Sequence, residues 1–239
     1  MRMCLTGAGV IVKAKNVAEG MRRIYQCLFE FFGPQHWWPA ETPFEVMLGA
    51  VLTQSTSWRN VESAIAQLRR AKALSAKALR DMPEEHLAGL IHSSGYYNAK
   101  AKKLKALCGW LAGYDDNIEI AFAGELPPKR RELLGIYGIG PETADSILLY
   151  AAGKHAFVID AYTRRICQRL GLCEQNASYE SCQRLFTEHM DADVLLFNEY
   201  HALLVRLGKD FCRPNNPLCP QCCLGSLCSY AGREPTSVD

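Results

Sequence analysis

The stretch from Leu134 to Asp160 holds residue types whose spacing suits the binding of an anion. Gly138 and Gly140 flank one apolar residue, so the backbone can turn sharply there and present its amides without an obstructing Cβ atom. Pro141 suits the first position of a helix, and apolar residues then recur at helical spacing. Amides at a helix start hold a phosphate without reading a base. We therefore predict contacts to nucleic-acid phosphates from Gly138, Ile139, Gly140 and Thr143.

A lone carboxylate, Asp160, follows the apolar pair Val158-Ile159 at the end of this stretch. Aspartate is a favoured residue at the position before a helix, and Ala161 to Leu170 has a helical pattern. Capping alone would therefore explain Asp160. A second role is open, because one residue can cap a helix and do chemistry.

Near the C-terminus, four cysteines follow the pattern Cys212-x6-Cys219-x2-Cys222-x5-Cys228. Thiolate quartets bind iron-sulfur clusters or zinc, whereas disulfides belong to secreted chains. Structural zinc usually shows two closely spaced cysteine pairs, so this spacing fits zinc poorly. Cys223 is a spare thiol, and a register that uses it in place of Cys222 is an alternative.

The other cysteines are scattered along the chain, and we assign them no function because buried free thiols explain most of them. They are Cys4, Cys27, Cys108, Cys167, Cys173 and Cys182. The segment Met1 to Lys15 has only a short apolar patch and no transmembrane run or signal peptide is recognisable, so we expect no membrane association and a reducing cytoplasm.

Helices must position these residues, because apolar side chains recur at helical spacing along nearly the whole chain. Thr42-Pro43-Phe44-Glu45 reads as a capping box that opens one such helix. No convincing alternating strand, internal repeat or low-complexity segment occurs. The sequence predicts an all-α fold of two helical domains.

The net charge of +2 is too small to indicate a DNA-binding protein by itself. Two segments are locally basic: 63–80 holds five basic residues and no acid, and 93–105 holds four lysines and no acid. Such runs are usually solvated helix faces. They also suit phosphate contacts, and we include Lys100 among the candidates.

These motifs together resemble the endonuclease III superfamily of DNA glycosylases. No β-branched strand precedes Gly138, so the glycine turn lies between two helices, as a helix-hairpin-helix, rather than in a dinucleotide-binding fold. The resemblance implies that Asp160, at its distance after the hairpin, is needed for base excision. The cysteine spacing also matches the [4Fe-4S] loop of this family, which implies that Cys212, Cys219, Cys222 and Cys228 hold such a cluster.

The family pattern also implies how the chain is divided. One domain would be the helical block 42–154 with the hairpin. The other would combine 1–41 with 155–239 and carry the cluster loop at 212–228. The substrate cleft is expected between the two domains. Asp160 would lie just past the point where the chain passes from one domain to the other.

Enzymes that excise a base first extrude it, fill the gap and hold the base among aromatic rings. Gln54, in V-L-T-Q-S-T, matches the gap-filling glutamine of the family, although a polar residue at a helix end is the simpler explanation. Trp37, Trp38 and Trp58 are candidates for the base pocket, although aromatic residues are more often core. Adjacent tryptophans point in different directions, so one of them could face the cleft.

Glu142 stands where bifunctional members of the family carry a lysine that forms a Schiff base with the sugar. A carboxylate cannot supply that amine, so strand cleavage by this route is expected to be absent. A glutamate in a first helical turn also simply favours the helix dipole. G-I-G-P-E-T-A-D, the Trp-Trp-Pro triplet, T-Q-S-T-S-W and D-A-Y-T resemble the branch that excises 3-methyladenine.

We therefore expect a monofunctional glycosylase that acts as a monomer on double-stranded DNA with an alkylated purine, in a bacterial or archaeal cytoplasm at the nucleoid. Asp160 would stabilise the oxocarbenium-like sugar or orient water. Three alternatives stay open. They are a glycosylase for oxidised pyrimidines that uses Lys154 or Lys100 as its amine, a mismatch glycosylase, and a cluster-containing DNA-binding module without catalysis.

Overall fold

The computed structural model describes residues 17–231, which form helices joined by turns without a strand among them. The all-α prediction is confirmed. Cys4 and the whole segment Met1 to Lys15 lie outside the described residues. Within the described part of the chain, no helix is both long and apolar enough to cross a membrane.

The described residues form two compact units. One unit comprises the described residues up to Trp37 and those from Phe157 onward, and the other is Trp38–Ala156. The predicted hairpin domain, 42–154, lies within the limits of the second unit.

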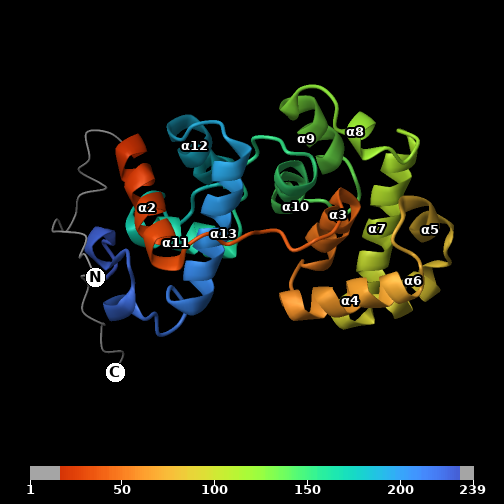
Figure 1. Cartoon of the computed structure of the whole chain (residues 1–239), viewed down its shortest axis with the longest axis horizontal. Helices are drawn as coiled ribbons and strands as arrows, with labels where there is room; N and C mark the ends of the chain where they lie inside the picture. The colour runs from red at the N-terminus through yellow and green to blue at the C-terminus, as the bar shows by residue number, and fades with distance from the viewer. Residues whose placement is uncertain (1–16, 232–239) are drawn as a thin grey trace. The chain divides into compact units, whose positions relative to one another are not determined.

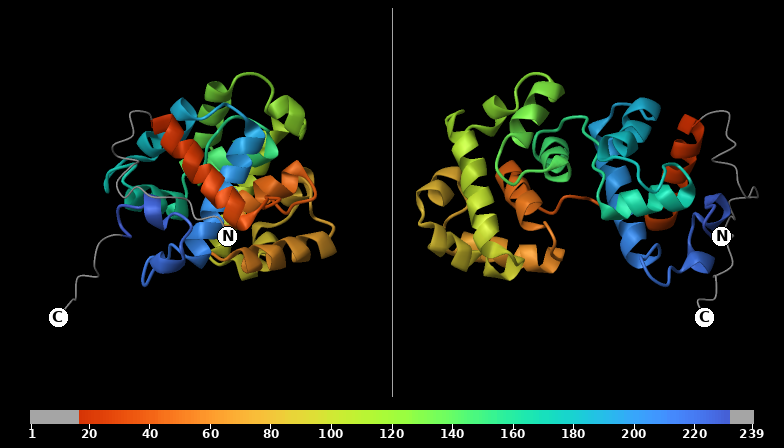
Figure 2. Two further views of the ribbon diagram at one scale, coloured as in Figure 1. Left: turned by 60° about the vertical axis from the view of Figure 1, so that its left-hand side comes forward. Right: turned by 180° about the vertical axis from the view of Figure 1, so that it is seen from behind.

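The first unit is built on four α-helices (Figure 1). They are α2 (Val17–Phe32), α11 (Ala161–Leu170), α12 (Tyr179–His189) and α13 (Val194–Asp210), followed by the short 3-10 turns η3 (Cys219–Gln221) and η4 (Gly225–Leu227). Helix α13 packs against both α2 and α11 (Figure 2). In the core, the Phe157 ring stacks on Phe186 at 3.7 Å, and the buried Tyr200 hydroxyl donates to the Met21 carbonyl at 3.0 Å. These contacts hold in place the irregular segment that leads into α11.

The second unit contains the remaining helices. They are α3 (Pro43–Leu52), α4 (Trp58–Arg70), α5 (Ala76–Asp81), α6 (Glu84–Leu90), η1 (His92–Ser94), α7 (Tyr97–Ala112), α8 (Ile118–Ala121), α9 (Leu126–Leu134), α10 (Pro141–Ser146) and η2 (Ile147–Ala151). Every residue of α3 after Pro43 is buried, because α4, α7, α10 and η2 all pack against it. Helix α3 is thus the centre of this unit and sets the position of the turn that follows it.

The predicted capping box at the start of α3 is present with one difference. The Thr42 hydroxyl accepts from the Glu45 amide at 3.2 Å, as expected. The Glu45 carboxylate accepts from the amide of Glu41 at 2.9 Å, and it pairs with Arg69 of α4 at 2.6 Å. Glu45 is only 4% exposed, so its charge is compensated by partners that also join α3 to α4.

The helix predicted from Pro141 continues to Ala151, but its second half is wider than an α-helix. The α-helical hydrogen bonds end at Ser146, and residues Ile147–Ala151 form a π-helical turn. Ala144, Ile147 and Leu148 are fully buried, as the apolar spacing predicts. The helix-hairpin-helix of α9 and α10 is therefore anchored on the core of the second unit.

Candidate functional site

Asp160 precedes α11 and caps it. Its backbone is extended, and one carboxylate oxygen, Oδ1, accepts from the Thr163 amide at 2.7 Å. The capping interpretation is therefore correct. The side chain is nevertheless 13% exposed and its second oxygen, Oδ2, does not serve the cap, which leaves that oxygen available for another role.

The second oxygen of Asp160 lies 3.6 Å from Nε2 of His201, which comes from α13 and is 6% exposed. Burial raises the pKa of the Asp160 carboxyl, but the His201 hydrogen bond and charge together with the Thr163 amide outweigh burial and lower the pKa below its ordinary value. Asp160 is therefore ionised at neutral pH although it is largely enclosed. The sequence does not reveal this contact, because 41 positions separate His201 from Asp160 along the chain.

The hairpin turn requires glycine at position 138. Gly138 has φ of +78°, and an added Cβ atom would lie 2.4 Å from Cγ of Lys103, a side chain of α7. Gly140 is exposed, and nothing lies within 4 Å of the place where its Cβ would stand. Of the two glycines, the first accommodates a neighbour and the second leaves room for a ligand.

Two of the predicted phosphate contacts are engaged inside the protein. The Ile139 amide donates to the Ile136 carbonyl at 3.1 Å, and its side chain is 5% exposed, so Ile139 closes the turn and packs in the core. Thr143 is 6% exposed, and its hydroxyl accepts from Nε2 of Gln54 at 2.9 Å. The predicted phosphate contact of Ile139 therefore conflicts with the turn geometry, and that of Thr143 conflicts with the burial of its side chain.

Gln54 lies two residues past α3 and is bound to the hairpin. Its amide nitrogen donates to the Gly138 carbonyl at 3.2 Å as well as to Thr143, and its amide oxygen accepts from Nζ of Lys103 at 2.6 Å. The next residue, Ser55, has φ of +53°, a conformation that non-glycine residues rarely adopt. Gln54 is half-buried and joins α3, α7 and the hairpin.

The prediction that Lys100 contacts phosphate is wrong, because the side chain is 1% exposed. Its ammonium donates to the carbonyls of Leu52 at 2.8 Å and Ser94 at 2.6 Å. Burial, with the nearby charge of Lys103, lowers the pKa of Lys100 to about 8. A lysine can satisfy carbonyls at the end of a buried helix, and a surface pattern of four lysines does not reveal which one points inward.

The Lys100 ammonium also brings the turn after η1 next to the end of α3, since it joins Ser94 to Leu52. Tyr96, two residues beyond Ser94, is 76% exposed and has φ of +46°. An exposed aromatic side chain in a strained turn is a candidate for base stacking. The sequence Gly95-Tyr96-Tyr97 indicates a turn, but it does not show which tyrosine faces out.

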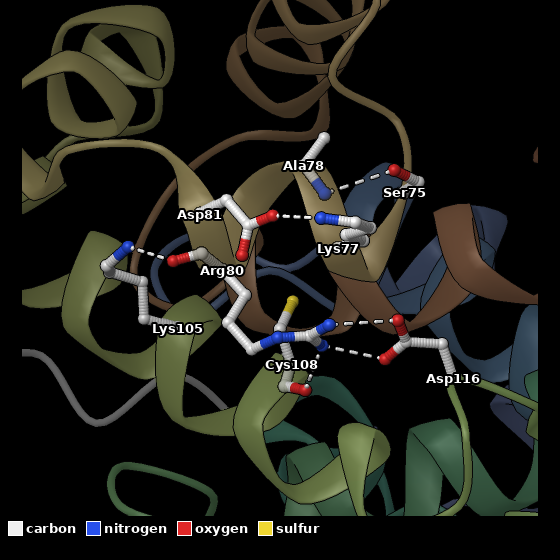
Figure 3. A network of polar contacts seen from close by, with 8 residues as sticks. All are labelled: Ser75, Lys77, Ala78, Arg80, Asp81, Lys105, Cys108 and Asp116. Atoms are coloured by element: carbon white, nitrogen blue, oxygen red, sulfur yellow. Dashed lines mark hydrogen bonds and ion pairs between the residues drawn. The ribbon is translucent and has the colours of Figure 1, made fainter.

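Three further basic residues of these segments, Lys77, Arg80 and Lys105, make contacts within the protein (Figure 3). Arg80 forms a two-bonded ion pair with Asp116, at 2.7 and 3.1 Å, which raises the pKa of the guanidinium. Lys105 donates to the backbone carbonyls of Arg80 and Met82, and Lys77 pairs with Asp81. Arg80 and Lys105 join α5 to α7 and are therefore structural, whereas the pair of Lys77 and Asp81 lies within α5.

The three candidate tryptophans have different surroundings. Trp38 packs edge-on against Trp58 at 5.1 Å, and its indole fits against Gly49, where an added Cβ would lie 3.1 Å from it. Trp58 also donates to Glu62 at 3.0 Å. Trp37 belongs to the other unit, where it lines a cavity of about 540 Å³ with Tyr25 and lies 5.9 Å from the Lys209 ammonium. The adjacent tryptophans do point to different neighbours.

Glu142 lies in the first turn of α10 and is exposed. Its carbonyl accepts from the Ser146 hydroxyl at 2.7 Å, which is an ordinary contact within a helix. Glu142 has no side-chain amine. Two lysines were candidates for the amine of a lyase: Lys154 donates to the Gly124 carbonyl at 2.7 Å, and Lys100 is buried as described above.

The four predicted cluster ligands line one cavity. Cys212, Cys219, Cys222 and Cys228 surround it together with Arg169 and Tyr230, and Cys223 is not part of the lining. Arg169 donates to the Cys212 sulfur at 3.2 Å, as suits a thiolate. The donor set therefore fits a [4Fe-4S] cluster, and the register with Cys222 fits better than the alternative with Cys223.

Comparison with known proteins agrees with this geometry. Residues 48–191 match the family described as the HhH-GPD superfamily base excision DNA repair protein. The "Putative DNA repair glycosylase" of Methanocaldococcus jannaschii is 42% identical over 90% of this chain and 98% of that protein. A trapped endonuclease III-DNA covalent intermediate superposes with a TM-score of 0.77 at 25% identity, covering 90% of this chain and 96% of that one.

A third similar protein is the H. pylori 3-methyladenine DNA glycosylase MagIII bound to 1,N6-ethenoadenine. Its TM-score is 0.68 at 27% identity, covering 81% of this chain and 95% of that one. The chain belongs to the HhH-GPD superfamily, that is, to the endonuclease III superfamily of DNA glycosylases.

The contrast between the two hairpin glycines can be tested by stability. Gly138→Ala should destabilise the fold by about 1–3 kcal/mol, because the positive φ is strained and the Lys103 side chain must move away from Gln54. Gly140→Ala is the matched control and should change the free energy of unfolding by less than about 0.5 kcal/mol. Urea unfolding measures both. Equal losses in the two variants would contradict the assigned role of Gly138.

Proposed function

We propose that the protein is a monofunctional DNA glycosylase, acting as a monomer on double-stranded DNA, that hydrolyses the N-glycosidic bond of an alkylated purine such as 3-methyladenine. The observation that carries the proposal is the exposed carboxylate of Glu142 in the first turn of α10. A Schiff base with the sugar requires an amine, which a carboxylate cannot replace. The similarity to a 3-methyladenine glycosylase supports the choice of substrate.

The leaving group sets what the protein must supply. A purine alkylated on a ring nitrogen is cationic, so its glycosidic bond is already weakened and needs little acid catalysis. The remaining requirement is a negative charge for the oxocarbenium-like sugar, or an acceptor that orients the attacking water. The Asp160 oxygen that faces His201 is the proposed source, since the other oxygen is occupied by the Thr163 amide.

The aromatic residues have a matching role in this proposal. The face of a tryptophan ring attracts a cation, and an alkylated purine is an electron-poor cationic ring. The Lys209 ammonium already lies 5.9 Å from the centre of the Trp37 ring, which supports the proposal that a cation can bind beside this ring. Trp38 and Trp58 pack against each other and would contribute to the shape of a pocket more than to stacking.

Contacts with the DNA strand would come from the hairpin and its neighbours. Gly140 would approach a phosphate, since the space beside it is empty. Gln54 supports the hairpin through Gly138 and Thr143, and it could fill the gap in the stack only by releasing these bonds. Tyr96 is proposed as an additional stacking residue, because its ring is exposed.

We also propose that Cys212, Cys219, Cys222 and Cys228 hold a [4Fe-4S] cluster. When bound, the cluster would join four thiolates and so fix the loop of residues 212–228. Arg169 would balance part of the negative charge, because it donates to the Cys212 sulfur and to the carbonyls of Arg213 and Pro214. Its own carbonyl accepts from Cys228, which joins α11 to the loop.

The proposed reaction is tested on a panel of duplexes that carry one alkylated, oxidised or mismatched base each. We expect release of the free base from the alkylated-purine duplex, and strand breaks only after alkali. Borohydride present during the reaction should trap no protein-DNA adduct, because the proposed route forms no imine. A trapped adduct, or activity confined to oxidised pyrimidines, would refute the monofunctional alkylpurine assignment.

The contact between His201 and Asp160 predicts a pH effect. His201→Leu removes the partner that lowers the pKa of Asp160 while burial still raises it, so the acid limb of the excision rate should move to higher pH. In the wild type, the stability that comes from the depressed Asp160 pKa is present above its unfolded value and is lost as the pH falls through the folded pKa. His201→Leu should therefore lack that stability near neutral pH, and its stability should fall less steeply than that of the wild type as the pH drops.

Single-turnover excision and thermal melting across the acidic range measure these two effects. His155→Leu is the control, because His155 is an exposed histidine outside the unit that holds Asp160. An acid limb at the same pH in His201→Leu and in wild type would show that His201 does not set the ionisation of Asp160.

A further inference from the structure

Lys103, a half-buried lysine of α7, places its charge on a neutral group beside the hairpin. Its ammonium donates to Oε1 of Gln54 at 2.6 Å. Its methylene chain covers Gly138, since Cγ, Cδ and Cε lie 2.4 to 2.6 Å from the place where a Cβ atom on that glycine would stand. Among the ion pairs of residues 17–231, none joins Lys103 to a carboxylate. A lysine next to the hairpin therefore has no anionic partner within the described part of the chain.

The Gln54 side chain is held at each of its polar atoms. Its Nε2 donates to the Gly138 carbonyl at 3.2 Å and to the Thr143 hydroxyl at 2.9 Å, and its Oε1 accepts from Lys103. A side-chain amide has two donor hydrogens, so both are in use. The Lys103 bond is the shortest of the three and the only one with a charged partner, which makes it the strongest of these contacts. Gln54 therefore leaves the hairpin only when Lys103 releases it.

The turn that carries Gln54 is weakly held by its own backbone. The Gln54 amide donates to the Val51 carbonyl at 3.4 Å, and the Thr56 amide donates to the Thr53 carbonyl at 3.3 Å. Both lengths lie beyond the ordinary range for backbone hydrogen bonds. Between them, Ser55 has φ of +53°, which is unfavourable for a residue with a side chain. The shorter side-chain bonds of Gln54 therefore help to fix this turn, and the turn can change shape when those bonds break.

A phosphate of the DNA strand is the group that can replace the Gln54 oxygen at Lys103. A phosphate oxygen is charged, so it binds an ammonium more strongly than a neutral amide oxygen does, and the contact releases counterions from the DNA. The Lys103 chain lies against Gly138. Gly140, where a phosphate is proposed to approach, is two residues further and so within about 7 Å along the backbone. A strand bound at Gly140 would therefore bring phosphates within reach of the Lys103 ammonium.

We propose that Lys103 is a positioning residue that couples strand binding to gap filling. In the free protein, Lys103 restrains Gln54 against the hairpin. When DNA binds, the ammonium moves from the Gln54 oxygen to a strand phosphate. Gln54 then leaves Gly138 and Thr143 and enters the gap that the extruded base leaves. The inference rests on the proposed gap-filling role of Gln54 and specifies how that role is controlled. It does not depend on which base is excised.

Affinity for a duplex with a tetrahydrofuran abasic-site analogue tests this exchange without any base release. The full chain is compared with Lys103→Met, Gln54→Ala and the double variant, and methionine keeps the length of the side chain that covers Gly138. We expect Lys103→Met to weaken binding in both backgrounds, with a loss about two- to tenfold larger in the Gln54→Ala background. Without Gln54, the ammonium gives up no hydrogen bond before it binds the phosphate.

The salt dependence of the same affinities counts phosphate contacts. Lys103→Met should lower the slope of log affinity against log salt by about one, and Lys103→Arg, which keeps the charge, should retain the wild-type slope. Lys77→Met is the matched control, because it removes the same charge from a lysine that pairs with Asp81 within α5. This control should keep the wild-type slope. A purely structural role of Lys103 would leave the slope of Lys103→Met unchanged as well.

Two results would contradict the inference. An equal or smaller loss from Lys103→Met in the Gln54→Ala background would show that Lys103 does not restrain Gln54 in the free protein. An unchanged salt slope in Lys103→Met would show that Lys103 meets no phosphate. Circular dichroism checks that each variant is folded, and Lys103→Gln takes the place of Lys103→Met in both measurements if the methionine variant does not fold. Neither result bears on the alkylpurine assignment, which the duplex panel decides.

Discussion

The structure of the first unit depends on keeping one buried carboxylate charged. Removing an ionised Asp160 from water is costly unless other groups compensate for the lost hydration. The Thr163 amide compensates from within α11, and His201 compensates from α13. Both helices must therefore be held in fixed positions, which the aromatic core around Phe157 and Tyr200 provides. Helix capping and the proposed chemistry use different oxygens of the Asp160 carboxylate.

The second unit meets a different constraint, which is a sharp turn held close to a packed core. Gly138 permits the turn, and Gln54 and Lys103 hold its carbonyl and its flank. The buried Lys100 ammonium donates to the Leu52 carbonyl at the end of α3. Most polar side chains near the hairpin thus bind each other, and the exposed Gly140 and Tyr96 are among the residues that remain accessible to a strand.

Local patterns were sufficient to predict the helices and the hairpin, and contacts between distant residues were not. The apolar spacing after Pro141 and the capping box at Thr42 were recognisable because their partners lie within one or two helical turns. The inward direction of Lys100 and the pairing of His201 with Asp160 could not be recognised, because each depends on how separate helices pack. The roles of Asp160, Glu142 and the tryptophans in catalysis stay predictions.

The most direct measurement of the central claim is the single-turnover rate of base release by Asp160→Asn on an alkylated-purine duplex, with DNA affinity measured in parallel. Asparagine still caps a helix but carries no charge, and Asp193→Asn, at the cap of α13, is the matched control. The account predicts that Asp160→Asn loses a factor of about 10² or more in rate and keeps its affinity, whereas Asp193→Asn keeps both. An unchanged rate in Asp160→Asn would contradict it.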